Sequence, residues 1–129
     1  MKKYKILIVE DERMLAEMMK RNFLEGQFTV RTCYNGSDAL ALVTADLPDL
    51  IILDVMIPGM DGWEILSKIK SDPHTASVPV IICTGKDSVQ DVERSYRAGA
   101  QAYLIKPFSF QTLLKKVAAV LDIEKLLND

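Results

Sequence analysis

Five short runs of β-branched and aliphatic residues divide this chain and determine which folds are open to it. Almost every residue within a run is apolar, which is typical of strands that are covered on both faces. Longer stretches with helical spacing of apolar residues separate the runs. Strands that alternate with helices predict a parallel sheet with right-handed crossovers, and hence a three-layer α/β sandwich. The runs are Lys5–Val9, Thr29–Cys33, Leu50–Leu53, Val80–Cys83 and Ala102–Ile105.

Each stretch between the runs is expected to bury one apolar face against the sheet. Met14, Met18 and Met19 are interpreted as core residues rather than as a groove for a partner. The last helix is predicted to be long and amphipathic. The predicted faces are Met14, Leu15, Met18, Asn22 and Phe23, then Ile65, Leu66 and Ile69, and finally Leu113, Leu114, Val117, Val120, Leu121 and Leu127.

Polar residues mark the expected ends of the helices. Ser88, with Asp91 three residues later, predicts a capping box at the start of the fourth helix, and Gly99 is expected to end that helix. Ser109 is expected to cap the N-terminus of the last helix.

Length and composition favour one globular domain over residues 1–129. The chain has 129 residues, of which 49% are hydrophobic and 26% are charged, as is ordinary for a soluble domain. This aliphatic content excludes a disordered chain. A formal net charge of −2 without a block of Lys and Arg excludes a strongly basic nucleic-acid binder. We therefore expect no direct binding to nucleic acid.

The cysteines and the N-terminal sequence indicate a cytoplasmic protein. Cys33 and Cys83 lie far apart and match no metal-ligand spacing, so we expect buried free thiols, which suit a reducing compartment. The apolar run Ile6–Val9 is interrupted by Glu10 and Asp11. It is too short for a signal peptide or a membrane span, and we expect no membrane insertion.

Charged and hydroxyl side chains follow or end four of the five predicted strands. Glu10 and Asp11 follow the first strand, Asp54 the third, Thr84 the fourth and Lys106 the fifth. In open α/β sheets, ligands bind outside the carboxyl ends of the strands. We therefore expect these side chains to converge at one edge of the sheet.

The chemistry of this set indicates phosphoryl transfer to the protein itself. Converging carboxylates repel one another unless a cation lies between them, and an all-oxygen ligand set selects a hard cation such as Mg²⁺. The metal, the Lys106 ammonium and the Thr84 hydroxyl together suit the oxygens of a phosphoryl group. Asp54, at the end of the central strand, is the predicted nucleophile that would form an aspartyl phosphate.

Taken singly, each of these residues has a plainer interpretation. Asp11 and Asp61 are candidates for helix caps, Asp54 for a turn residue, Thr84 for a strand-end hydroxyl and Lys106 for a solvated charge. Helix capping does not explain why Asp54 and Lys106 are predicted at the same edge of the sheet as Asp11. Their joint placement therefore favours a functional site at that edge.

Five segments match the pattern of a known family, namely Ile6–Glu12, Leu53–Gly62, Cys83–Gly85, Gly99–Ala100 and Lys106–Phe108. Through them the sequence resembles the receiver domains of two-component response regulators over essentially its whole length. The resemblance implies a flavodoxin-like fold in which five helices flank a parallel sheet of strand order 2-1-3-4-5. It also implies a signalling switch that is controlled by phosphorylation.

The resemblance implies a metal site and a phosphoacceptor. Asp54 is the implied acceptor of a phosphoryl group from a histidine kinase or a histidine phosphotransfer protein. Asp11 and Asp54 are the implied Mg²⁺ ligands, with the Met56 carbonyl as a third, while Glu10 reaches the metal through water. Such a domain is not an enzyme in the usual sense, because it catalyses only its own phosphorylation and autodephosphorylation.

The same resemblance implies how the signal is read out. Thr84 and Lys106 are the implied phosphoryl contacts, and Tyr103 is the implied switch aromatic, which turns inward when the Thr84 hydroxyl moves toward the phosphate. The expected output surface comprises helix 4, strand 5 and helix 5, which would control a downstream effector. Met56 and Lys86 are expected to rim the pocket and to set the lifetime of the acyl phosphate. The Lys106–Pro107 bond is expected to be cis.

Three positions depart from the common family pattern. Glu10 stands where Asp is frequent, and Gly85 stands where Ala is common, so a looser loop is expected there. Gln101-Ala102 replaces the acidic pair that winged-helix regulators often carry, which weakens an assignment to that subclass. No effector domain follows the last predicted helix, so we expect a stand-alone receiver or one domain of a longer regulator.

Three alternative functions compete with the signalling switch. A phosphatase of the haloacid dehalogenase type needs a second Asp two residues after its nucleophile, where this chain has Met56. A flavodoxin-like electron carrier needs a phosphate-binding loop after the first strand, where the acidic segment Glu10–Glu12 would repel phosphate. A receiver-shaped scaffold that binds partners without phosphorylation remains open, although intact Asp54, Thr84 and Lys106 argue against it.

Overall fold

The computed structural model describes residues 3–23, 27–57, 60–86 and 88–123. Within these ranges, strands and helices alternate strictly, and the strands form one parallel sheet in the order β2-β1-β3-β4-β5. The predicted fold class and strand order are therefore confirmed. The elements are β1 (Tyr4–Val9), α1 (Arg13–Asn22), β2 (Phe28–Cys33), α2 (Gly36–Ala45), β3 (Leu50–Leu53), α3 (Gly62–Ser71), β4 (Val80–Thr84), α4 (Val89–Arg97), β5 (Ala102–Ile105) and α5 (Phe110–Leu121).

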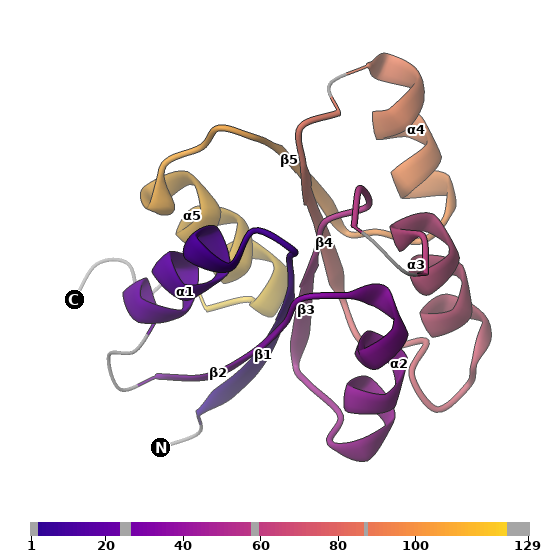
Figure 1. Cartoon of the computed structure of the whole chain (residues 1–129), viewed down its shortest axis with the longest axis horizontal. Coiled ribbons are helices and arrows are strands. Elements are labelled where there is room, and N and C mark those ends of the chain that lie inside the picture. The colour runs from indigo at the N-terminus through magenta and orange to yellow at the C-terminus, as the bar shows by residue number, and fades with distance from the viewer. Residues whose placement is uncertain (1–2, 24–26, 58–59, 87, 124–129) are drawn as a thin grey trace.

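Helices cover both faces of the sheet, with α1 and α5 on one face and α2, α3 and α4 on the other (Figure 1). Successive side chains of a strand point to opposite faces. Ile6 and Ile8 of β1 accordingly belong to the core under α1 and α5. Leu7 and Val9 belong to the core on the opposite face. Two covered faces explain why the strands are apolar throughout rather than at every second residue.

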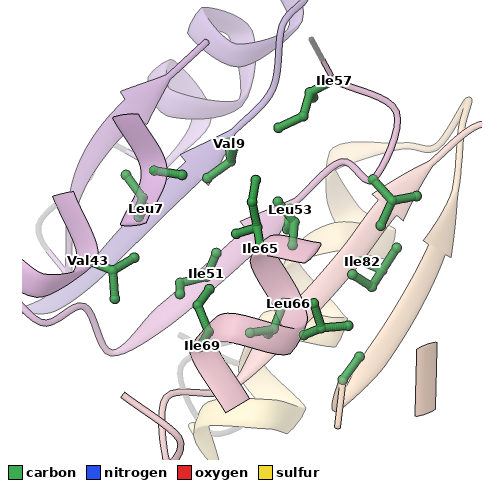
Figure 2. Packing of buried hydrophobic residues seen from close by; sticks show 14 of the residues in the cluster. Leu7, Val9, Val43, Ile51, Leu53, Ile57, Ile65, Leu66, Ile69 and Ile82 are labelled. Carbon is green, nitrogen blue, oxygen red and sulfur yellow. The ribbon is translucent and has the colours of Figure 1, made fainter. Parts of the chain in front are cut away.

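The core beneath α3 is closely filled by branched aliphatic side chains. Figure 2 shows Ile65, Leu66 and Ile69 of α3 lying over the central strands of the sheet. Ile51 and Leu53 of β3 belong to the same cluster. All five side chains are at most 1% exposed. Burying one such side chain contributes about 1.5 to 3 kcal/mol. This packing holds β3 in place, and with it Asp54, the residue that follows β3.

The predicted capping residues Ser88, Gly99 and Ser109 are confirmed. The Ser88 and Ser109 hydroxyls accept hydrogen bonds from backbone N–H groups three residues later, at 3.0 and 3.1 Å, at the starts of α4 and α5. The Asp61 carboxylate accepts one from an N–H two residues later at 2.9 Å, at the start of α3. Gly99 follows α4 with a left-handed φ of 103°, which a residue with a Cβ adopts only under strain.

The prediction for the buried face of α1 is wrong in part. Met19 is buried as expected, but Met14 is 84% exposed and Met18 is 55% exposed. The buried stripe comprises Ala16, Met19 and Phe23, and the partly buried Leu15 packs against it. Leu15 and Phe23 of the predicted face therefore contact the core as expected. The exposed stripe of α1 runs through Met14 and Met18 to the polar Asn22. The Asn22 side-chain amide donates a hydrogen bond to the Met18 carbonyl at the surface of the helix.

The last helix is shorter than its apolar pattern predicts. It ends at Leu121, and Asp122 adopts a left-handed conformation with a φ of 59°. Leu127, which the apolar pattern places in this helix, lies outside the described residues, as do Pro58 and Gly59 before α3. None of the helices in the described ranges has the length and apolar content that crossing a membrane requires.

Candidate functional site

The hydrogen-bond ladder of the sheet continues one residue beyond three of the strands. The backbone N–H groups of Glu10, Asp54 and Lys106 donate to carbonyl oxygens of neighbouring strands at 2.9, 3.0 and 2.9 Å. Thr84 is the last residue of β4. The sheet therefore fixes the backbone of these residues at its carboxyl edge, as the sequence predicts.

Three carboxylates meet at this edge. Glu10, Asp11 and Asp54 each offer an oxygen that lies within 4.8 Å of the oxygens offered by the other two. Glu10 and Asp54 are only 1% and 4% exposed, whereas Asp11 faces solvent. Oxygen ligands that are open to water on one side suit Mg²⁺, which usually binds one or two carboxylates and retains several waters. The donor set thus fits the predicted metal.

The Lys106 ammonium reaches into this acidic cluster. Its Nζ lies 2.6 Å from Oε1 of Glu10 and 2.9 Å from Oδ2 of Asp54. A third carboxylate, that of Glu12, lies 3.6 Å away. The Lys106 side chain is only 16% exposed, so it is a paired charge within the site and not a solvated surface charge.

The two oxygens of Asp54 have different partners. Oδ2 accepts a hydrogen bond from Lys106 Nζ, and Oδ1 accepts one from the backbone N–H of Met56 at 2.8 Å. These two bonds fix the orientation of the carboxylate. The Met56 side chain itself is 56% exposed, and the role predicted for the Met56 carbonyl as a metal ligand stays a prediction.

The Thr84 hydroxyl is buried and has no hydrogen-bond partner among the residues that the structure describes. A buried hydroxyl that lacks a partner costs about 1 to 3 kcal/mol. An oxygen atom of a bound ligand would satisfy it.

Tyr103 lies inward, with 7% of its surface exposed. Its hydroxyl donates to the backbone carbonyl of Lys86 at 2.7 Å. Lys86 belongs to the segment that connects β4 to α4. The aromatic residue predicted to act as a switch therefore ties β5 to the start of the α4 region.

Burial and pairing shift two pKa values in the site. Burial raises the pKa of Glu10 from 4.5 to about 7, although the hydrogen bonds from Lys106 and from the Glu12 N–H oppose the shift. Burial alone would lower the pKa of Lys106, but its hydrogen bonds to Glu10 and Asp54 prevail and hold that pKa above its ordinary value. The ammonium is therefore fully charged at neutral pH.

The capping alternatives have opposite outcomes for the two aspartates. Asp61 caps α3, as its plainer interpretation held. The N-cap residue of α1 is Glu12, which makes no side-chain capping bond. In the described part of the chain the Asp11 carboxylate accepts no hydrogen bond from a backbone N–H of α1, and its described place is in the acidic cluster. Sequence reasoning assigned no role to Glu12, although its place in the acidic run after β1 marked it as a candidate.

Comparison with protein families gives a match along most of the chain. The model of the response regulator receiver domain matches residues 6–118. Among curated proteins, the transcriptional regulatory protein HprR of Escherichia coli K12 is 42% identical over 124 residues, which are 96% of this chain and 54% of HprR. PcoR of Escherichia coli is 39% identical over 91% of this chain and 51% of its own length. The chain thus spans about half the length of these relatives.

Solved structures agree with this match. The signal receiver domain of a DNA-binding response regulator (merR) from Colwellia psychrerythraea superposes with a TM-score of 0.85 at 35% identity, covering 92% of this chain and 98% of that one. The chemotaxis response regulator CheY4 of Vibrio cholerae also gives a TM-score of 0.85, at 29% identity and the same coverage of both chains.

Proposed function

Because this chain belongs to the family of response regulator receiver domains of two-component signalling, we propose that it accepts a phosphoryl group on Asp54. Residues 1–129 would act as one receiver domain. The donor would be a histidine kinase or a histidine phosphotransfer protein, and Mg²⁺ would be required. The observation that carries the proposal is the buried Asp54 carboxylate, held 2.9 Å from Lys106 Nζ and beside two further acids.

The phosphoryl transfer would proceed by direct displacement at phosphorus. A carboxylate oxygen of Asp54 attacks the phosphorus of a phosphohistidine. The bond between phosphorus and the imidazole nitrogen breaks, and the imidazole leaves with that bonding pair and takes up a proton. The two hydrogen bonds to Asp54 already orient its carboxylate, so little conformational freedom is lost when the donor arrives.

Repulsion between negative charges is the main obstacle to this step, and a bound Mg²⁺, the Lys106 ammonium and the Thr84 hydroxyl would each lower that repulsion. When bound, Mg²⁺ would neutralise the charge shared by the carboxylates and the phosphoryl oxygens. Asp11, Asp54 and the Met56 carbonyl would hold the metal directly, and Glu10 would hold it through water. The Lys106 ammonium would pair with one phosphoryl oxygen.

The Thr84 hydroxyl would donate to another phosphoryl oxygen, which would satisfy a buried group that has no partner among the residues described. Tyr103 would then convey the change to the surface of α4, β5 and α5, where a downstream effector would bind. The relatives HprR and PcoR are transcriptional regulatory proteins about twice as long as this chain. An effector that controls transcription is therefore one candidate for this output. Direct binding of nucleic acid by residues 1–129 is not proposed.

Two alternatives make different predictions for the same site. A phosphatase of the haloacid dehalogenase type would need an acid where Met56 stands, and the Met56 side chain carries no proton to donate. A scaffold that is never phosphorylated would leave Asp54 unmodified. A cytoplasmic location suits the switch, since its proposed donors act there.

Intact mass after treatment with acetyl phosphate tests the proposal. We expect the mass of one phosphoryl group to be added in the presence of Mg²⁺ and no addition in the presence of a chelator. Asp54→Asn is expected to abolish the addition, whereas Asp46→Asn, at an exposed residue paired with Lys5, is expected to retain it. Labelling that persists in Asp54→Asn would show that another residue is the acceptor.

A further inference from the structure

Few buried side chains hold α4 to the rest of the molecule. The structure describes every residue of α4, and among them only Ser95 is buried. Val92 is partly buried and packs against the core cluster beneath α3. The helix α3, on the same face of the sheet (Figure 1), buries five residues, among them Trp63. Elements that bury little apolar surface move most easily, so any further contact that anchors α4 affects its position.

One such contact joins α4 to α3 through a cation and an aromatic ring. The guanidinium carbon of Arg94 lies 4.3 Å from the centroid of the Trp63 ring, which is within the range of cation–π attraction. Arg94 is exposed, whereas Trp63 is only 9% exposed. Within the described ranges, this guanidinium pairs with no carboxylate, and the ring is its partner.

Trp63 stands at the start of α3, where that helix meets the backbone next to Asp54. Gly62, which precedes Trp63, lies so close that its Cβ would be 2.2 Å from Val55 Cα. The backbone N–H of Gly62 also donates to the Val55 carbonyl at 3.3 Å. Closely packed groups transmit a displacement because they cannot be compressed. A shift of the backbone after Asp54 therefore displaces the first turn of α3, and Trp63 with it.

The contact between Arg94 and Trp63 occurs together with an unmodified Asp54 carboxylate. Oδ1 of this carboxylate accepts the backbone N–H of Met56 at 2.8 Å, which ties it to the segment between β3 and α3. A phosphoryl group on Asp54 would change this bond, and so act on the same segment. A contact that belongs to one arrangement stabilises that arrangement relative to others.

We propose that the contact between Arg94 and Trp63, which we call the α3–α4 latch, stabilises the position of α4 that accompanies unmodified Asp54 and thereby opposes phosphorylation. This inference rests on the proposed function. The effect is mutual: if phosphorylation weakens the latch, loss of the latch makes phosphorylation more favourable by the same factor. Arg94 is thus a positioning residue that acts through Trp63. The route includes neither Thr84 nor the Tyr103 hydroxyl.

Calorimetric titration with beryllium fluoride in the presence of Mg²⁺ tests the latch, because beryllium fluoride imitates a phosphoryl group on an aspartate. We expect Arg94→Gln to bind beryllium fluoride about two- to fivefold more tightly than the unsubstituted protein, the factor that corresponds to one exposed cation–π contact. Arg94→Lys retains a cation and is expected to bind with nearly the unsubstituted affinity. Unchanged or weaker binding by Arg94→Gln would overturn the proposal.

Arg97→Gln is the matched control, since it removes the same charge from the last turn of the same helix. Loss of a positive charge by itself weakens the binding of an anion. We therefore expect Arg97→Gln to bind beryllium fluoride as tightly as the unsubstituted protein or slightly less tightly. An equal gain in Arg97→Gln and Arg94→Gln would show that charge on α4, and not the latch, sets the affinity.

The fluorescence of Trp63 reports the latch directly, because the sequence contains no other tryptophan. We expect acrylamide to quench this fluorescence weakly in the protein alone, where the ring is nearly buried. Quenching is expected to become stronger when Mg²⁺ and beryllium fluoride are added, because Arg94 then leaves the ring. A quenching constant that stays the same would contradict the proposal.

Trp63→Leu removes the ring and tests whether Arg94 acts through it. In this background we expect Arg94→Gln to have no further effect on the binding of beryllium fluoride. Equal gains in both backgrounds would mean that Arg94 acts without the ring, which contradicts the latch. If Trp63→Leu does not fold, the comparison of Arg94→Gln, Arg94→Lys and Arg97→Gln still decides the question.

The proposed function and this inference fail in different ways. Absence of beryllium fluoride binding by the unsubstituted protein with Mg²⁺ would refute the proposed function. Normal binding that Arg94→Gln does not strengthen would refute this inference alone.

Discussion

The hydroxyl of Tyr103 donates a 2.7 Å hydrogen bond to the backbone carbonyl of Lys86, and so joins β5 to the segment that leads into α4. The tyrosine is buried, and its ring belongs to the same core as Trp63 and Ile82. The bond therefore connects the region of the site to the proposed output surface.

Tyr103→Phe removes this bond and keeps the ring. We expect it to destabilise the protein by about 1 kcal/mol and to speed amide hydrogen exchange around Lys86, while phosphorylation of Asp54 is retained. Tyr96→Phe, at a residue that is 49% exposed on α4, is the control and should change neither quantity. Equal exchange rates near Lys86 in both variants would show that the hydroxyl does not restrain this segment.

Gly62 lies against the backbone of Asp54, the proposed phosphoacceptor, and of Val55. A Cβ at this position would lie 2.2 Å from Val55 Cα and 2.8 Å from the Asp54 carbonyl oxygen. Since backbone atoms cannot yield cheaply, we expect Gly62→Ala to destabilise the protein by about 2 to 3 kcal/mol and to slow phosphorylation. Chemical denaturation measures the first effect.

Gly85→Ala is the matched control for Gly62→Ala. Apart from Gly85 and its two chain neighbours, no heavy atom of the described residues lies within 4 Å of the position that its Cβ would take. We expect a change of at most about 0.5 kcal/mol in the free energy of unfolding. If the two glycine variants were equally stable, the close approach to the backbone of Asp54 and Val55 would not be what restricts position 62 to glycine.

The raised pKa of Glu10 predicts how the stability of the metal-free protein depends on pH. The folded state holds this proton up to about pH 7, whereas the unfolded state releases it near 4.5. The protonated Glu10 therefore contributes its full stabilisation below pH 4.5, the pKa of the unfolded state. This stabilisation is lost as the pH rises through about 7, the pKa of the folded state. The Lys106 ammonium contributes no change in this window, because its ordinary pKa is 10.5 and its folded pKa is higher.

We therefore expect the protein in chelator to lose about 2 kcal/mol of stability between about pH 5 and about pH 8, relative to Glu10→Gln. Denaturant unfolding at the two pH values measures the difference. Parallel pH profiles for the two proteins would contradict a proton on Glu10 in the folded state.

Cys83 is predicted to resist thiol reagents although it lies next to Thr84 of the site. The side chain is 1% exposed, and burial raises its pKa to about 12. The thiolate, which is the reactive form, is therefore scarce. We expect slow alkylation of Cys83 in the folded protein and rapid alkylation after unfolding. Rapid labelling of the folded protein at Cys83, identified by peptide mass, would contradict the burial.

The sequence was sufficient to predict the sheet and the convergence at its carboxyl edge, because both follow from short-range patterns. Asp54 and Lys106 directly follow apolar runs, and this change from apolar to charged residues marks where the strands end. Parallel strands place their carboxyl ends at the same edge of the sheet. Ser88, Ser109 and Asp61 also mark helix starts by local hydrogen bonding.

The sequence predicted the buried face of α1 only in part, because Met14 and Met18 are exposed whereas Met19 and Phe23 are buried. Met14 and Met18 are as apolar as Met19, and hydrophobicity does not distinguish stripes that differ by one position on the helix. The outcome depends on where α1 lies relative to Phe23 and the sheet, which is a tertiary property. The pairing of Lys106 with Glu10 was missed for a similar reason, since the partner of a lysine without a bound phosphoryl group depends on distances across strands.

A crystal structure with Mg²⁺ and beryllium fluoride, which imitates a phosphoryl group, tests the central claim most directly. We expect beryllium bonded to an Asp54 oxygen, the metal held by Asp11 and Asp54, and contacts from Thr84 and Lys106 to the fluorides. An acidic cluster without metal, and an Asp54 carboxylate without an adduct, would contradict the account.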